Sequence, residues 1–284
     1  MVDSLQKIDE ETLVQLNLNK ARMTLVDKNR SNELLEAMPN PTQAAGGSAA
    51  NTAYWAAQLG GNVGFIGKIS NDELGIQFKE SVKKSGLNDF TIFETEDNQT
   101  GHCAIFITPD GERTMNTYLG AGAFLSVEDL NEEAIKSAEI LYMEGYLWDR
   151  PTSKEAFLYA AKLNKSSGGK NAITLSDVFC VEMHRDSFIE FIKESIDFVF
   201  CNEEEIMSLT MKETIDEAIN SFTNLFPNIE ELVCTLGPRG ALVISNGKKS
   251  NYDATEAEVV DKTGAGDYFA AGYLYGLQKK LSIE

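Results

Sequence analysis

Short apolar runs alternate with amphipathic stretches along most of the chain. The apolar runs are rich in β-branched and aromatic residues, as buried strands are, and cover residues 63–66, 140–143, 172–175, 198–201, 232–235 and 241–244. The stretches between them have helical periodicity and cover residues 48–59, 75–85, 153–163, 185–194, 203–209 and 215–225. This alternation predicts an α/β fold with a mostly parallel central sheet flanked by helices.

Two stretches, at about residues 12–45 and 91–118, interrupt the alternation with strand-like pieces. Within the second, Pro109-Asp110-Gly111 is a turn sequence that predicts a hairpin between residues 102–107 and 113–118. We interpret both stretches as a small β lid that covers a cleft.

The expected organisation is therefore one α/β core with one lid. The core comprises residues 46–90 and 119–284, with residues 1–11 as a remnant of its first strand. The lid comprises residues 12–45 and 91–118. We find no internal repeat, low-complexity tract or long linker, so the core and the lid are expected to fold together as one unit.

Composition and charge exclude several classes of partner. The chain has 25 Lys and Arg against 44 Asp and Glu, and its formal charge of −19 is spread along the sequence, which disfavours nucleic acid and anionic membranes. Neither a signal peptide nor an apolar run of about 18 residues is present, so we expect a cytoplasmic protein. The four cysteines form no CxxC pair and are expected to pack in the core, and His102 and His184 are interpreted as ordinary residues.

The segment Gly264-Ala265-Gly266-Asp267 stands directly before a helix-like stretch at residues 268–280. Glycines at a helix start let the backbone approach an anion, and the free N–H groups there bind negative charge. A carboxylate beside a bound phosphate is best explained as a general base, which makes Asp267 the candidate base of a phosphotransferase. The alternative is that Asp267 only caps the helix and the glycines only turn the chain.

A second glycine pair opens another helix. Gly46 and Gly47 precede an Ala-rich stretch that carries Asn51, so backbone N–H groups and an amide are presented together. Neutral donors and acceptors of this kind suit a polyhydroxylated ligand. Close packing of helices through small residues explains the alanines, but it explains the glycines and Asn51 less well.

Two further groups follow predicted strands, where ligands bind in open α/β sheets. Asn202 and Glu205 are spaced i and i+3 at a helix start, a pair that could hold magnesium through water, or could simply satisfy the helix dipole. Residues 235–240 provide a hydroxyl and two glycines, which form either a phosphate cradle or a hairpin turn.

The order of these four motifs resembles the ribokinase-like (PfkB) family of carbohydrate and nucleoside kinases. The motifs are GGSAAN at 46–51, NxxE at 202–205, TLGxxG at 235–240 and DxTGAGD at 261–267. Within the family, residues 114–121 and 144–148 look most like the bacterial adenosine-kinase-like branch. The resemblance implies a doubly wound core with a β lid, and transfer of the ATP γ-phosphate to a primary hydroxyl with Mg²⁺ as the nucleotide's partner.

The resemblance also implies roles for individual residues. Asp267 would be the base, and the anion hole would be the N–H groups of Gly264, Ala265, Gly266 and Asp267. The acceptor hydroxyls would be held by Asp3, Gly46, Gly47 and Asn51. The nucleotide side of the site would be formed by Asn202 and Glu205, which organise magnesium and phosphate through water, by Thr235, Gly237 and Gly240, and by Arg113 reaching in from the lid.

The acceptor and the assembly stay open at this point. An adenosine-like nucleoside is the first expectation, with a free sugar of the ribose or fructose type as the alternative, and the lid strands could pair across a homodimer. Compared with the family, the chain lacks a first central strand and the helices after the last motif. It is therefore expected to be a fragment, to be completed by a neighbouring chain, or to be a catalytically silent binding module. Lys262 stands where the last motif of the family usually has Thr, Ser, Pro or Val. This difference puts a monovalent-cation site near that loop in doubt.

Overall fold

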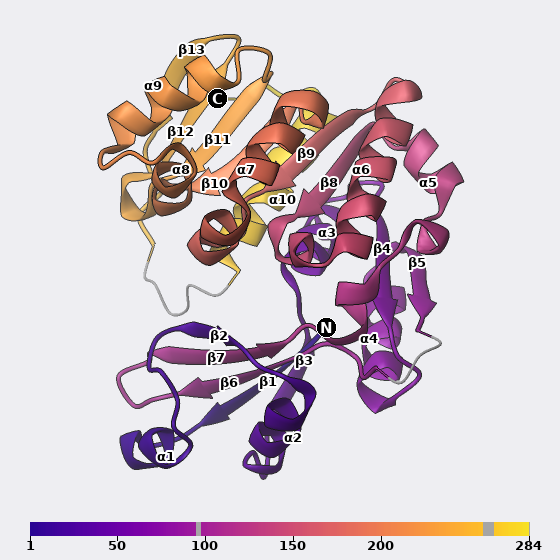
Figure 1. The fold of residues 1–284 in the computed structure, drawn as a ribbon, viewed down its shortest axis with the longest axis vertical. Helices are drawn as coiled ribbons and strands as arrows, with labels where there is room; N and C mark the ends of the chain where they lie inside the picture. The colour runs from indigo at the N-terminus through magenta and orange to yellow at the C-terminus, as the bar shows by residue number, and fades with distance from the viewer. Residues whose placement is uncertain (95–97, 258–263, 284) are drawn as a thin grey trace. The chain divides into compact units, whose positions relative to one another are not determined.

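The structure is a computed structural model that describes residues 1–94, 98–257 and 264–283. The chain divides into two compact units, residues 1–58 with 62–125, and residues 59–61 with 126–284. The first unit contains β1 to β7 and α1 to α4, and the second contains β8 to β13 and α5 to α10 (Figure 1).

A five-stranded sheet in the order β2-β7-β6-β1-β3 organises the first unit. Its strands are β1 (Val2–Lys7), β2 (Met23–Leu25), β3 (Thr42–Ala45), β6 (His102–Ile107) and β7 (Arg113–Tyr118). β6 and β7 form an antiparallel hairpin, and β1 runs parallel to β6 and antiparallel to β3. The predicted hairpin is therefore confirmed, with Gly111 at a φ of +84° in its turn.

Two helices of this unit begin at aspartate caps. The Asp9 side chain accepts from Thr12 N at the start of α1 (Glu10–Gln15), and Asp27 accepts from Arg30 N at the start of α2 (Lys28–Glu36). Leu34 of α2 is fully buried and packs in one apolar cluster with Ala104 and Phe106 of β6. One face of the sheet is therefore covered by α2.

The remaining elements of the first unit pair β4 (Gly64–Ile69) in parallel with β5 (Asn88–Phe93). The helix α3 (Ser48–Gln58) precedes β4 in the chain, and α4 (Glu73–Lys84) connects β4 to β5. Phe78 and Val82 of α4 pack in one apolar cluster with Val2, Ala53 and Ile69. The short 3-10 helices of the chain lie at Gly120–Phe124, Val127–Asp129, Gly145–Asp149 and Gly237–Arg239.

The second unit is built on a six-stranded sheet in the order β13-β12-β11-β10-β9-β8. The strands are β8 (Ile140–Glu144), β9 (Lys170–Thr174), β10 (Phe198–Asn202), β11 (Glu231–Thr235), β12 (Ala241–Ser245) and β13 (Lys248–Tyr252). β8 to β11 are parallel, while β12 and β13 are antiparallel. The continuous apolar runs in the parallel strands follow from burial on both faces.

Helices cover both faces of this sheet. They are α5 (Glu132–Ser137), α6 (Pro151–Ser166), α7 (Val178–Ser195), α8 (Glu203–Thr210), α9 (Ile215–Leu225) and α10 (Ala265–Gln278). The connections that carry α6, α7 and α8 join neighbouring parallel strands, so these helices lie on the same side (Figure 1). α10 packs Phe269 and Ala270 against Phe198 and Phe200 on the other side.

The α/β class is confirmed, and five of the six predicted core strands lie in the six-stranded sheet, whereas residues 63–66 fall in β4, which pairs with β5 in the first unit. Residues 1–11 were also assigned to the wrong sheet. We expected these residues to be a remnant of the first core strand, whereas β1 pairs with β6 along its whole length. Hydrogen bonds flank this pairing at both ends, where Val2 N donates to Gly101 O and Ile8 N donates to Ile107 O. A strand needs a partner on each side to pair its backbone N–H and C=O groups, and the two partners of β1 are β6 and β3. The 12–45 stretch also differs, because it contains α2 as well as strands.

The four cysteines are all buried, as expected of core residues. In the part of the chain that the structure describes, no helix is both long and apolar enough to cross a membrane.

Candidate active site

Gly264 is the N-cap residue of α10, and its φ of +72° places it in the left-handed region that favours glycine. Ala265, Gly266 and Asp267 then form the first turn, and Ala265 and Gly266 are exposed. The first N–H groups of an α-helix have no partner within the helix, so this turn presents donors to solvent with a carboxylate beside them. The predicted helix start is thus present, and anion binding by its first turn stays a prediction.

The direction of α10 is fixed by a contact at its middle. The Tyr273 hydroxyl donates to Glu231 Oε2 at 2.6 Å, and Glu231 is the first residue of β11. Ala270, one turn nearer the N-terminus of α10, packs in one cluster with Phe200 and Val233, which lie further along their strands than Glu231. The N-terminus of α10 therefore points toward the carboxyl ends of the parallel strands. Ligands of open α/β sheets bind at that edge.

Asn202 and Glu205 occupy the same edge, where β10 ends and α8 begins. Asn202 Oδ1 accepts from Glu205 N at 2.8 Å, while Glu205 Oε2 accepts from Asn202 N at 3.1 Å. Asn202 Nδ2 donates to the other carboxylate oxygen at 2.7 Å. The pair is therefore a reciprocal capping box, so the helix-dipole interpretation of these residues is correct as far as the fold is concerned.

Burial changes the chemistry of Glu205. Its side chain is only 5% exposed, and this burial raises its pKa to about 7, an effect to which nearby Asp177 adds and which the hydrogen bond from Asn202 N opposes. A carboxyl group with this pKa changes charge near neutral pH. Asp177, which follows β9, was missed from the sequence, and only its position after a predicted strand could have indicated it.

The donor set fits magnesium as a partner reached through water. Both Glu205 oxygens already accept hydrogen bonds from Asn202, but each carboxylate oxygen has a second lone pair for a bound water. Among the residues that the structure describes, no three His, Cys, Asp or Glu side chains are grouped closely enough to hold a metal directly. Mg²⁺ characteristically keeps several waters, and magnesium at this pair stays a prediction.

Thr235, Gly237 and Gly240 lie next to this pair. Thr235 is the register partner of Asn202, which brings both to the same edge of neighbouring strands. The segment that follows is a tight connection to β12, with Leu236 N donating to Gly240 O at 2.8 Å. Gly240 has a φ of +90°, and a side chain there would overlap the carbonyl oxygen of Tyr252. Of the two alternatives for this segment, the hairpin turn is present, and contact with nucleotide stays a prediction.

Asp3 and Gly46 meet in the first unit. They lie on the neighbouring strand ends of β1 and β3, and Gly46 N donates to Met1 O at 3.1 Å. A Cβ at Gly46 would overlap the carboxyl carbon and both carboxylate oxygens of Asp3. The glycine is therefore what allows the carboxylate to lie against this backbone.

Gly47 and Asn51 continue this group into α3. Gly47 has a φ of +103°, and its carbonyl accepts from Asn51 N at 2.8 Å in the first turn of the helix. Of the predicted acceptor residues, Gly46, Gly47 and Asn51 thus lie around the connection from β3 to α3, and Asp3 lies against it from the neighbouring strand β1.

The face of the sheet on which Asp3 lies could not be predicted from the sequence. Register partners share a face of a sheet, and the row that contains Asp3 also contains Cys103, Thr117 and Leu25. The next row on that face consists of Leu5, Ile105, Met115 and Met23. A carboxylate therefore borders a largely apolar surface, to which Leu25 contributes a side chain that is 40% exposed. The alternation of side chains along a strand could have indicated this face, but only if the strands that pair with β1 had been known.

The structure does not test the roles predicted for Arg113 and Lys262. Arg113 is the first residue of β7 in the first unit, opposite Ile107, and a role in balancing phosphate charge stays a prediction. Lys262, with Asp261 and Thr263, lies outside the described residues.

Comparisons with known proteins agree with this geometry. The family model described as pfkB family carbohydrate kinase matches residues 11–284. A probable sugar kinase from Rhizobium etli is 36% identical with a TM-score of 0.92, and an adenosine kinase from Sinorhizobium meliloti is 36% identical with a TM-score of 0.90; each match covers the whole of this chain and 86% of the other. Probable fructokinase-6 of Arabidopsis thaliana is 30% identical over 85% of this chain, which spans 64% of that relative's length.

The match to the family model extends over most of the chain, and the two structural relatives share its fold over its full length. The motif order agrees with both findings. The chain belongs to the pfkB family of carbohydrate kinases.

Proposed function

We propose that this chain is an ATP-dependent kinase that phosphorylates a primary hydroxyl of a nucleoside of the adenosine type. The observation that carries the proposal is the first turn of α10, where exposed N–H groups and the carboxylate of Asp267 stand together at the ligand-binding edge of the sheet. Donors and a base in one turn suit phosphoryl transfer, in which positioning and charge stabilisation supply most of the catalysis.

In the proposed reaction, the acceptor hydroxyl gives its proton to Asp267 as its oxygen forms a bond to the γ-phosphorus. The bond between that phosphorus and the bridging oxygen breaks, and ADP leaves with the electron pair. The N–H groups of Gly264, Ala265, Gly266 and Asp267 stabilise the negative charge on the transferred group.

Asn202 and Glu205 would hold Mg²⁺ through water at the same edge. When bound, Mg²⁺ neutralises charge on the nucleotide phosphates. Ionised Glu205 suits this role better than its protonated form, because a cation favours the carboxylate. Thr235 and Gly237 offer a hydroxyl and an unobstructed backbone beside this pair, which supports a nucleotide contact there.

For the acceptor, Asp3 would bind the sugar hydroxyls while the apolar rows of the five-stranded sheet contact the base. A free sugar has hydroxyls around its whole ring and offers little to an apolar surface, whereas a purine has apolar faces. Leu5 and Leu25, which are not buried, therefore favour a nucleoside. The second candidate is a free-sugar kinase, which the similarity to a fructokinase favours.

The assembly is also part of the proposal. β2 and β3 are the edge strands of the five-stranded sheet, and an exposed edge can pair with a second copy of the chain. Pairing of this kind would give a homodimer formed through the lid.

The test is ATP consumption by the 284-residue chain with magnesium and a panel of acceptors: adenosine, other nucleosides, ribose and fructose. Turnover with adenosine well above that with the sugars is the expected result. Turnover with a sugar alone would replace the acceptor assignment, and a folded chain that consumes no ATP with any acceptor would be a silent binding module.

A further inference from the structure

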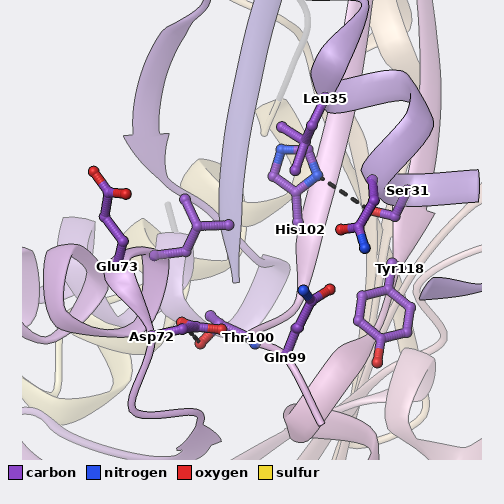
Figure 2. A pocket seen from close by; sticks show the side chains of 10 residues that line it. Ser31, Leu35, Asp72, Glu73, Gln99, Thr100, His102 and Tyr118 are labelled. Carbon is purple, nitrogen blue, oxygen red and sulfur yellow. Dashed lines mark hydrogen bonds between the residues drawn. The ribbon is translucent and has the colours of Figure 1, made fainter. Parts of the chain in front are cut away.

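Two side chains join the segment that leads into β6 to the start of α4. Asp72 is the N-cap residue of α4, where its Oδ1 accepts from Gly75 N at 2.8 Å. The Thr100 hydroxyl donates to the same oxygen at 2.6 Å, and Thr100 N donates to Oδ2 at 2.8 Å. Figure 2 shows the two side chains together, at one wall of a cavity of about 150 Å³ that His102 and α2 also line. One carboxylate therefore binds both a helix and a segment that is distant in sequence.

Thr100 is held firmly in place. Its side chain is only 1% exposed, and its hydroxyl oxygen also accepts from Ser70 N at 3.0 Å, directly after β4. A side chain at Gly75 would overlap both the Ser70 carbonyl oxygen and the Thr100 hydroxyl, so the glycine is what lets α4 begin this close. Hydrogen bonds to a carboxylate are stronger than those between neutral groups. The contact between Asp72 and Thr100 is therefore a strong attachment within the first unit.

The residue after Thr100 holds the first residue of β1. Val2 N donates to the carbonyl oxygen of Gly101 at 2.9 Å, at the start of the pairing between β1 and β6. A side chain at Gly101 would overlap the carbonyl oxygen of Leu119, so the backbone of residue 101 lies directly against that of residue 119. Because Thr100 is fixed on one side and Leu119 lies on the other, the Gly101 carbonyl has little room to shift.

Asp3 follows Val2 directly, so its position depends on the same attachment. Val2 is fully buried and packs against residues of α4, the helix that Asp72 caps. The start of β1 is therefore constrained twice by this helix, through the packing of Val2 and through the hydrogen bonds between Asp72 and Thr100. The Asp3 carboxylate lies one residue further on, against Gly46.

We propose that Thr100 and Asp72 are positioning residues for the acceptor, because they fix the start of β1 and with it the Asp3 carboxylate. The inference rests on the proposed function, in which Asp3 binds the acceptor hydroxyls. A residue that only stabilises the fold changes the unfolding midpoint alone, whereas a positioning residue also changes KM for the acceptor. KM for ATP should stay the same, since the proposed nucleotide residues Asn202 and Glu205 belong to the second unit.

Thr100→Val tests the proposal, because valine keeps the branched shape of threonine and removes its hydroxyl. We expect KM for adenosine to rise about tenfold, since small displacements of positioning groups have effects of this size. KM for ATP should not change. Thr100→Ser keeps the hydroxyl and should restore KM for adenosine to that of the unmodified chain. Steady-state kinetics with each substrate varied in turn measures both constants.

Thr91→Val is the matched control. Thr91 is also a buried threonine of the first unit, 6% exposed, and its hydroxyl also donates to an aspartate, Asp89. It lies on β5, which belongs to a different sheet from β1. This variant should lower the unfolding midpoint as Thr100→Val does, but it should leave KM for adenosine unchanged. An equal increase of this KM in the two variants would show that the loss of any buried hydroxyl is sufficient, and would overturn the proposal.

Amide hydrogen exchange, followed by NMR, needs no turnover and therefore separates this inference from the proposed function. The Val2 amide should exchange about tenfold faster in Thr100→Val than in Thr91→Val, because only the first variant loosens the start of β1. If the unmodified chain phosphorylates no acceptor, the proposed function fails, and exchange at Val2 still decides whether Thr100 fixes β1.

A second variant covers the case in which Thr100→Val does not fold. Asp72→Asn replaces one of the two oxygens that accept from Thr100, and it is then judged by the same measurements. The proposal is overturned if exchange at Val2 is the same as in Thr91→Val or if KM for adenosine does not rise. A Thr100→Ser variant that fails to restore this KM also overturns it.

Discussion

The carboxylate of Asp3 lies directly against the Cα of Gly46, in the space that a side chain at position 46 would occupy. The two residues are far apart in sequence and meet because β1 and β3 are antiparallel neighbours. Asp3 therefore depends on Gly46 for its position, and a change at the glycine should act on the acceptor through the aspartate.

Gly46→Ala should displace the Asp3 carboxylate, because a methyl group would overlap it. We expect KM for the acceptor to rise about 10-fold to 100-fold, with little change in KM for ATP, since misplacing a positioning group costs about this much. Steady-state kinetics with each substrate varied checks this. Gly276→Ala is the matched control, because a Cβ there meets open space inside α10. Equal acceptor KM values in Gly46→Ala and the unmodified chain would contradict the account.

The apolar face beside Asp3 should matter only for an acceptor that has a base. Leu25→Ala removes a side chain that is 40% exposed, so the expected stability change is within about 0.5 kcal/mol. We expect KM for adenosine to rise about 10-fold and any activity with ribose to stay the same, as measured by parallel assays. Leu158→Ala, a similarly exposed leucine on α6, is the control. If the loss is equal for adenosine and ribose, the face does not contact the base.

Glu205 should make both stability and magnesium use depend on pH. Its pKa is about 7 in the folded chain against 4.5 for an ordinary glutamate, so between these values the folded state holds a proton that the unfolded state has released. Folding is therefore progressively destabilised as pH rises from about 4.5 to 7, by on the order of 3 kcal/mol in full. Glu205→Gln removes this dependence, so its stability relative to the unmodified chain should increase from pH 5 to pH 8.

Urea unfolding at the two pH values measures this difference, and the magnesium requirement of the reaction should lose its midpoint near pH 7 in the same variant. Glu204→Gln, the exposed neighbour, should change both quantities far less. If the stability of Glu205→Gln relative to the unmodified chain is the same at pH 5 and pH 8, Glu205 has an ordinary pKa.

The connection between β11 and β12 should tolerate no side chain at Gly240. The backbone there has a φ of +90°, and a Cβ would overlap the Tyr252 carbonyl oxygen. Gly240→Ala should therefore destabilise the chain by more than about 2 kcal/mol, combining backbone strain with a steric clash. Gly247→Ala should cost about 1 kcal/mol, because its φ is also positive but its Cβ meets open space. Equal unfolding midpoints for the two variants would contradict the close approach.

Local patterns predicted the elements far better than their pairing. β8 to β11 were evident because strands buried on both faces are continuously apolar, and the β6–β7 hairpin was evident from its turn residues. Residues 2–7 were assigned to the wrong sheet because the partner of a short strand is decided by contacts distant in sequence. The start of α10 was predictable because glycine and a helix N-terminus are local features.

The rest of the site was not predictable because it depends on contacts between residues that are distant in sequence. The pKa of Glu205 depends on burial under neighbouring elements, and the overlap of Asp3 with position 46 depends on strand pairing. His102 was interpreted as ordinary because its sequence neighbours reveal neither α2 above it nor the cavity beside it.

The central claim is that Asp267 is the base of a phosphoryl transfer. Asp267→Asn keeps the size of the side chain and removes its ability to accept the proton. We predict that kcat falls by about 10²–10⁴ while adenosine and ATP bind with nearly unchanged affinity, as measured by calorimetry alongside turnover. Asp216→Asn, which breaks only an exposed ion pair with Lys249, should leave kcat unchanged. A kcat within a few-fold of the unmodified chain in Asp267→Asn, with binding intact, would contradict the account.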